Sequence, residues 1–246
     1  MQSKRRILGQ HFVDDEETLR KVVALAEIQY GERVLEIGAG KGSLTKELCR
    51  TGAKIVSYEI DGRLFPELES EFSNIRNVQL VNANIFKRNI SFDVLVANLP
   101  YSRSEEFIEW LTVKNFRKAV VMLQTDFVDK ILSRSGKNYR AVSVIAQYCF
   151  SIRRVLEVPA HLFKPPPKVS SSVIVIERKP VTPTKSEIKS LKYLWSFKGK
   201  TVASAIKAIA KKSDKDLKTV EVPEKRIAEL SPEQAFRVAK VIEQAN

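Results

Sequence analysis

The run VLEIGAGKGSLTKEL, residues 34–48, carries the clearest indication of the fold. Its first four residues, Val34 to Ile37, are typical of a short buried strand. Glycines occupy every second position directly after that strand, and Ser43 to Arg50 then has the spacing of a helix. A strand that ends in a glycine loop and leads into a helix is typical of the nucleotide-binding end of an open α/β sheet.

Strands and helices alternate along the rest of the first two thirds of the chain. Further strands are predicted at Lys54–Ile60, Val78–Val81, Phe92–Asn98 and Lys118–Gln124. Helices are predicted at Arg63–Phe72, Glu105–Leu111 and Asp126–Leu132. Two later β-rich runs, Val142–Val158 and Ser171–Lys179, indicate a hairpin-like end to the sheet. The alternation favours an α/β fold, a mainly parallel Rossmann-like sheet with helices on both faces.

A Pro/Thr-rich seam, KPVTPT at residues 179–184, marks a domain boundary. Beyond it the pattern is helical only. We therefore expect a catalytic or binding domain over 1–179, a linker over 180–184 and a small all-helical domain over 185–246.

The chain is basic, with a formal net charge of +13 and a pI of about 9.7. Residues 185–246 hold 14 Lys and Arg against 8 Asp and Glu, a net charge of +6. A lysine-rich face is often only a solvated helix surface. Next to a site shaped for a nucleobase, binding to a polyanion is the better interpretation. The candidate RNA-binding lysines are Lys198, Lys200, Lys207, Lys211 and Lys212.

Several classes of protein are disfavoured by composition. No apolar run approaches the roughly 18 residues that a membrane-spanning helix requires. The basic N-terminus lacks the apolar core of a secretory signal. Two histidines and two cysteines form no visible metal-ligand cluster. We expect a soluble, cytoplasmic, monomeric protein without a metal.

The glycine loop and the next strand predict a nucleotide site. Gly38 and Gly40 let the backbone approach a ligand closely, because a Cβ atom would intrude there. Glu59 follows 21 residues after Gly38 and can accept hydrogen bonds from ribose hydroxyls. The alternative is a dinucleotide site, but Ser43 stands where that fingerprint requires a third glycine or an alanine.

The motif NLPY, residues 98–101, directly follows the predicted strand at 92–98. The exocyclic amine of adenine is a poor nucleophile because its lone pair is delocalised into the ring. The Asn98 side-chain oxygen and the Leu99 carbonyl are acceptors that can draw this amine towards tetrahedral geometry. Pro100 fixes the backbone and Tyr101 offers a ring for stacking. The motif predicts methyl transfer from a sulfonium to adenine, which depends on positioning rather than on a strong base.

In order along the chain, GQHFVDD (residues 9–15), VLEIGAGKGSLTKEL, NLPY and FKPPPKVSSSV (residues 163–173) resemble motifs of the small-subunit ribosomal RNA adenine dimethyltransferase family. WSFKGKTVASAI and ELSPEQAF resemble stretches of that family's small helical domain. The resemblance implies an S-adenosylmethionine-dependent methyltransferase sheet. It further implies dimethylation of two adjacent adenosines near the 3′ end of small-subunit rRNA and a part in small-subunit biogenesis.

Individual roles follow from the same resemblance. It implies that His11 and Val13 contact the cofactor, as do Gly38, Gly40, Glu59, Asn84 and Asn98. Asn98 and Tyr101 match the amine-orienting and base-stacking positions. Phe163 matches an aromatic that closes over the target base, which predicts a sandwich with Tyr101.

Three positions depart from the family pattern: Asn84, Arg103 and Val13, the last a conservative replacement of leucine. Asn84 stands where an aspartate usually accepts a hydrogen bond from the cofactor's adenine amine, which predicts weaker binding and a gain for Asn84→Asp. Arg103 replaces a usually apolar residue, and is either a surface change or an added phosphate contact.

Two alternative functions stay open. One is a large-subunit rRNA adenine methyltransferase of the antibiotic-resistance type, in which the NLPY leucine tends to be isoleucine. The other is a non-catalytic assembly or nucleic-acid-binding factor of the same fold, an idea that Asn84 keeps open.

Overall fold

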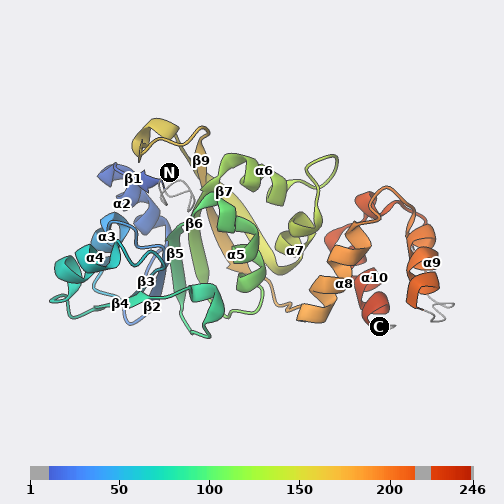
Figure 1. Ribbon diagram of the computed structural model, residues 1–246, viewed down its shortest axis with the longest axis horizontal. Coiled ribbons are helices and arrows are strands. Elements are labelled where there is room, and N and C mark those ends of the chain that lie inside the picture. Colours follow the sequence, from blue (N-terminus) through green and yellow to red (C-terminus); the bar gives the residue numbers. More distant parts are fainter. Residues whose placement is uncertain (1–10, 214–222, 245–246) are drawn as a thin grey trace. The chain divides into compact units, whose positions relative to one another are not determined.

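The computed structural model describes residues 11–213 and 223–244 (Figure 1). The chain divides into two compact units. The first contains the described residues up to Val128 together with Ser151–Arg178, and the second contains Asp129–Phe150 and the described residues from Lys179 onwards. The division near Lys179 lies beside the predicted linker, whereas the grouping of Asp129–Phe150 with the C-terminal helices was not expected. The domain boundaries given above stay a prediction.

A seven-stranded sheet organises the first unit, in the order β4-β3-β2-β5-β6-β9-β7. The strands are β2 Arg33–Ile37, β3 Lys54–Glu59, β4 Val78–Asn82, β5 Val94–Asn98, β6 Lys118–Gln124, β7 Phe150–Val158 and β9 Ser171–Arg178. The strands from β4 to β6 are parallel, and β9 is antiparallel to β6. The predicted mainly parallel sheet is confirmed, and its last two strands, β7 and β9, are neighbours.

The strand order places a switch point between β2 and β5. From β2 the chain proceeds outwards through β3 to β4, and then returns to the other side of β2 to form β5. Connections that leave in opposite directions open a crevice at the carboxyl ends of the two strands. The glycine loop after β2 and the NLPY motif at the end of β5 therefore face the same crevice.

Helices cover both faces of this sheet, as predicted (Figure 1). The helices that precede β6 are α2 Glu16–Leu25, α3 Ser43–Cys49, α4 Phe65–Phe72 and α5 Ser104–Leu111. Val94 and Val96 of β5 join a buried cluster that includes residues of α2 and α3. Leu95 and Ala97 are equally buried but lie outside that cluster. Since successive side chains point to opposite faces, β5 is buried on both sides, which explains its continuous apolar run.

A two-stranded sheet joins two motifs that are 150 residues apart in the sequence. Strand β1, Phe12–Val13, pairs antiparallel with β8, Phe163–Lys164, and Val13 is opposite Phe163. The Asp14 amide donates to the Leu162 carbonyl at 2.9 Å, and Lys164 pairs with the Asp14 carboxylate. This sheet holds the HFV segment in place beside the crevice.

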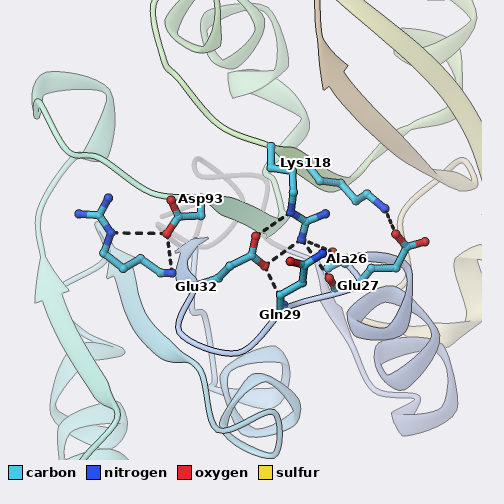
Figure 2. A network of polar contacts seen from close by, with 8 residues as sticks. Ala26, Glu27, Gln29, Glu32, Asp93 and Lys118 are labelled. Carbon is cyan, nitrogen blue, oxygen red and sulfur yellow. Dashed lines mark hydrogen bonds and ion pairs between the residues drawn. The ribbon is translucent and has the colours of Figure 1, made fainter.

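A polar network ties together the amino ends of the strands, at the edge of the sheet opposite the crevice (Figure 2). Arg117 donates from Nε and Nη2 to the Glu32 carboxylate at 2.6 and 2.8 Å, and it holds the pKa of that carboxyl below its usual value. Lys118 pairs with Glu27, and Asp93 accepts from the Arg33 amide at 2.8 Å. The network fixes where β2, β5 and β6 begin.

The second unit is helical, with α7 Ala141–Cys149, α8 Lys185–Trp195, α9 Val202–Ser213 and α10 Pro232–Gln244. The remaining helix, α6 Thr125–Leu132, crosses the division between the units. The expected β-rich run at 142–158 was wrong in its first half, because residues up to Cys149 form α7. Tertiary packing overrides the β propensity there: Tyr148 of α7 stacks on Phe236 of α10 with ring centroids 4.0 Å apart.

Within the described ranges, no helix is long and apolar enough to cross a membrane. The same residues contain no group of three or more His, Cys, Asp or Glu side chains arranged to hold a metal ion.

Candidate active site

A cavity of about 250 Å³ lies at the carboxyl ends of β2, β3 and β5 in the first unit. It is lined by residues from the opening segment, the glycine loop and the segments that follow β3, β4 and β5. The lining residues are His11, Phe12, Ile37, Gly38, Gly40, Tyr58, Glu59, Ile60, Ala83, Asn84, Ile85, Phe86, Asn98, Leu99, Pro100, Tyr101, Ser102 and Arg103. Thus most of the predicted site residues meet in one cavity.

The glycine loop closes against an aromatic ring that the sequence analysis did not assign to the site. Gly40 has a φ of +60°, and a Cβ atom there would lie 2.7 Å from the Phe12 ring. Lys41 Nζ lies 5.7 Å from the centroid of the same ring. Phe12 belongs to the opening motif GQHFVDD, which indicated that this segment belongs to the site. The motif did not indicate that the Phe12 ring contacts the glycine loop.

Glu59 is the only carboxylate among the described residues that line the cavity. Its Oε2 accepts from the Gly40 amide at 2.8 Å and its Oε1 from the Asp61 amide at 2.7 Å. Burial raises the pKa of this carboxyl above its usual value, and the two amides partly oppose that rise. The contacts fix the carboxylate beside the glycine loop, where each oxygen retains a lone pair for a ligand hydroxyl.

Asn98 has a defined amide orientation. Its Nδ2 donates to the His11 carbonyl at 3.1 Å. Because Nδ2 is engaged in this bond, Oδ1 is the end of the amide that is available to a ligand. No described residue donates a hydrogen bond to Oδ1. The Leu99 amide donates to the Met122 carbonyl at 3.3 Å, which holds the backbone next to β6. The motif therefore presents acceptor oxygens whose positions are set by the opening segment and by the sheet.

Tyr101 is held at its ring and at its hydroxyl. The ring stacks on the His11 imidazole with centroids 5.6 Å apart and an interplanar angle of 28°. The hydroxyl lies 2.7 Å from Ser171 Oγ at the start of β9, and burial raises the pKa of the phenol. His11 is itself anchored, since its Nδ1 lies 2.8 Å from the Pro165 carbonyl oxygen. An aromatic platform is thus fixed beside Asn98.

Asn84 and Arg103 are in contact in the cavity wall. Arg103 Nη2 lies 3.4 Å from Asn84 Oδ1, and the same oxygen accepts from the Phe86 amide at 3.1 Å. Both positions depart from the family pattern in sequence, but nothing in the sequence indicates that they are in contact. Nineteen residues and two loops separate them in the chain, and no spacing rule indicates such a contact.

Two of the predicted catalytic and cofactor-binding residues lie outside the cavity. Phe163 is 1% exposed and Val13 is 3% exposed, and both belong to the buried cluster beneath α2 and α3. Their side chains do not line the cavity. The structure therefore does not bring Phe163 together with Tyr101 as a sandwich, and its stacking role stays a prediction.

The candidate RNA-binding lysines lie in the second unit. Lys200, Lys207 and Lys211 are exposed and Lys198 is half-buried, while the side chain of Lys212 lies outside the described residues. Lys200 Nζ is 5.5 Å from the Phe197 ring centroid. Their contact with RNA stays a prediction.

A comparison with models of protein families identifies the family of the chain. The family model described as ribosomal RNA adenine dimethylase matches residues 1–244. The chain belongs to the ribosomal RNA adenine dimethylase family. This result confirms the resemblance seen in the motifs and places the chain among rRNA adenine methyltransferases.

Curated relatives carry matching names. Ribosomal RNA small subunit methyltransferase A of Thermotoga neapolitana is 35% identical over 211 residues, which cover 82% of this chain and 80% of the relative. The probable enzyme of that name from Thermococcus gammatolerans is 34% identical over 243 residues, covering 95% and 87%. Family members of this kind occur in bacteria and archaea.

Solved structures share the fold. A dimethyladenosine transferase from Plasmodium falciparum matches with a TM-score of 0.77 at 24% identity, covering 93% of this chain and 96% of that one. The 23S rRNA methyltransferase ErmE matches with a TM-score of 0.64 at 24% identity, covering 95% and 100%. At this identity the likeness concerns the fold, and the predicted methyltransferase architecture of the family is confirmed.

Proposed function

We propose that this protein transfers methyl groups from S-adenosylmethionine to the exocyclic amines of two adjacent adenosines near the 3′ end of small-subunit rRNA, giving dimethyladenosines. The observation that carries the proposal is the hydrogen bond from Asn98 Nδ2 to the His11 carbonyl. That bond leaves an amide oxygen as the acceptor at the place where the target amine is expected.

The cavity fits the proposed cofactor. Glu59 offers a fixed carboxylate for ribose hydroxyls beside the glycine loop, where Gly38 and Gly40 leave room for close approach. Ile60 and Phe86 supply apolar walls of the size and kind that a purine requires. When bound, S-adenosylmethionine supplies an electrophilic methyl group on a sulfonium with a good leaving sulfur.

The residues of the chain act by positioning. Asn98 Oδ1 and the Leu99 carbonyl accept the two amine hydrogens, so the nitrogen lone pair is freed from the ring and directed at the methyl carbon. The bound cofactor would supply the methyl group and would leave as a neutral thioether, and the amine would release its surplus proton to water. Tyr101 holds the base that has left its stack, and this contact offsets part of the unstacking cost.

The substrate assignment rests on kinship and on charge. The curated relatives are named small-subunit methyltransferases. Lys198, Lys200, Lys207 and Lys211 supply a basic surface for rRNA in a chain with a formal net charge of +13. Our proposal includes a single chain as the active form and a part for the protein in small-subunit assembly.

The substrate is tested by incubating the protein and labelled S-adenosylmethionine with unmethylated small subunits, and separately with naked large-subunit rRNA. We expect label in the small subunits only. Label in the large-subunit RNA alone would replace the proposal by the 23S-type activity. Binding to small subunits without label in either substrate would favour a non-catalytic assembly factor.

A further inference from the structure

Asn84 and Arg103 form a defined cluster in the cavity wall. Besides its contact with Asn84 Oδ1 at 3.4 Å, the Arg103 guanidinium lies 5.1 Å from the centroid of the Phe86 ring. It also pairs with Glu106, with 3.0 Å between Nη2 and Oε2. Two of these contacts hold Arg103 against the segment that follows β4, and the third ties it to α5. Asn84 and Arg103 both line the cavity.

The cluster determines which end of the Asn84 amide is available to a ligand. An amide oxygen has two lone pairs, and here it meets two donors, the Phe86 amide at 3.1 Å and Arg103. The Asn84 Nδ2 donates to no other described residue. Asn84 therefore offers the cavity a hydrogen-bond donor, whereas an aspartate at this position offers only acceptors.

We propose that Asn84 and Arg103 together determine which atoms of the cofactor's purine are recognised, with Asn84 donating to an acceptor on the purine edge. The inference rests on the proposed function, because it assumes that the base lies against Asn84. Adenine offers the ring nitrogen beside its amine to such a donor, whereas a 6-oxopurine, in which that nitrogen is protonated, offers its exocyclic oxygen. A carboxylate at position 84 would repel the oxygen of a 6-oxopurine, whereas the Asn84 amide can donate to it. The cavity should therefore discriminate against 6-oxopurines much less than a site with a carboxylate does.

Arg103 stabilises the orientation of the Asn84 amide, because its guanidinium contacts Asn84 Oδ1. A carboxylate at position 84 would lie within ion-pair distance of the guanidinium and would be drawn to it. The gain in cofactor affinity that the sequence predicts for Asn84→Asp is therefore expected in full only when Arg103 is replaced as well. Leucine is the suitable replacement, because it keeps an apolar contact with Phe86 and removes the charge.

The test is calorimetric binding of S-adenosylhomocysteine and S-inosylhomocysteine to the unchanged protein and to Asn84→Asp, Arg103→Leu and the double variant. We expect the unchanged protein to bind the two ligands within about threefold of each other. The double variant should prefer the adenosyl ligand by about tenfold or more, because its carboxylate opposes the 6-oxo group. Asn84→Asp should shift the preference less when Arg103 is present than when it is absent.

Strict preference of the unchanged protein for S-adenosylhomocysteine, equal to that of the double variant, would overturn the inference while leaving the proposed function intact. Equal shifts by Asn84→Asp in both backgrounds would also overturn it, because Arg103 would then have no part in the selection. Failure of the unchanged protein to bind S-adenosylhomocysteine at all would overturn both the inference and the proposed cofactor.

Discussion

Tyr101 is positioned by its ring on one side and by its hydroxyl on the other, and the two contacts have separable consequences. Tyr101→Phe keeps the ring but loses the contact with Ser171 Oγ. Tyr101→Ala loses the platform. Since stacking of a base on an aromatic side chain contributes roughly 1–3 kcal/mol, we expect Tyr101→Ala to lower methylation of small subunits by about tenfold or more. Tyr101→Phe should lower it only a few-fold.

Initial rates at saturating cofactor check this prediction, with S-adenosylhomocysteine binding measured in parallel. Equal losses in both variants would mean that the hydroxyl, and not the ring, is the important group.

Phe163 is the residue at which motif and structure point to different roles. The resemblance implies that its ring stacks on the target base, whereas the described side chain is buried next to Val13 in the core. Phe163→Leu distinguishes the roles, because leucine fills much of the space but cannot stack. Packing predicts a loss of stability of about 1–2 kcal/mol and nearly unchanged methylation.

Thermal unfolding and methylation rates of the same Phe163→Leu preparation give the answer. A loss of activity of tenfold or more with little change in stability would support the stacking role.

At the scale of single elements, the junction of β2 and α3 holds a buried acid. Glu36 is fully buried; its Oε2 accepts from Thr45 Oγ1 at 2.7 Å and from Ser57 Oγ at 2.6 Å, while Oε1 has no hydrogen-bond partner among the described residues. Burial raises the pKa of this carboxyl to about 7. The acid therefore binds its proton more tightly in the folded chain than in the unfolded one.

The consequence is a pH-dependent stability. Because the ordinary pKa is 4.5, the free energy of unfolding should fall as the pH rises from about 4.5 to about 7, by up to about 3 kcal/mol. Glu36→Gln cannot ionise and should remove this part of the dependence. Chemical unfolding of both proteins at about pH 5 and about pH 8 measures it. An equal pH dependence in the two proteins would show that Glu36 is not responsible.

Element types could be predicted from sequence where local pattern and packing agree. The strands β2, β3, β5 and β6 are apolar runs between turn signals, so they were found within two residues of their observed ends. Helix α7 was missed because its β-branched residues pack in a helical unit that no local pattern reveals. No prediction was made for α2, although Asp15 caps it by accepting from the Thr18 amide at 2.7 Å.

The residues of the site could be predicted where they stand at the ends of predicted strands. Glu59 and Asn98 end β3 and β5, and Asn84 closely follows β4. The carboxyl ends of such parallel strands meet at one edge of the sheet. The direction of the Asn98 amide was not predictable, because it depends on the His11 carbonyl 87 residues away. Side-chain contacts between distant loops require coordinates.

At the scale of the whole molecule, the positive net charge favours binding to a polyanion such as rRNA. The net charge is +13, and Lys198 and Lys200 are among the basic residues of the second unit. If Lys200 contacts a phosphate, Lys200→Glu should weaken binding to small subunits and reduce the slope of log affinity against log salt by about 1. Lys54→Glu changes the net charge equally at an exposed site in the first unit and should leave the slope unchanged.

Filter binding or sedimentation of the three proteins with small subunits over a range of salt concentrations provides the slopes. Identical slopes for Lys200→Glu and Lys54→Glu would mean that only overall charge matters.

The most direct measurement of the central proposal compares the unchanged protein with Asn98→Ala in nucleoside analysis of small-subunit rRNA after incubation with S-adenosylmethionine. Loss of one acceptor that acts in the transition state should lower the rate by about a hundredfold or more. We expect dimethyladenosine with the unchanged protein and almost none with Asn98→Ala. Equal amounts of dimethyladenosine from both proteins would contradict it.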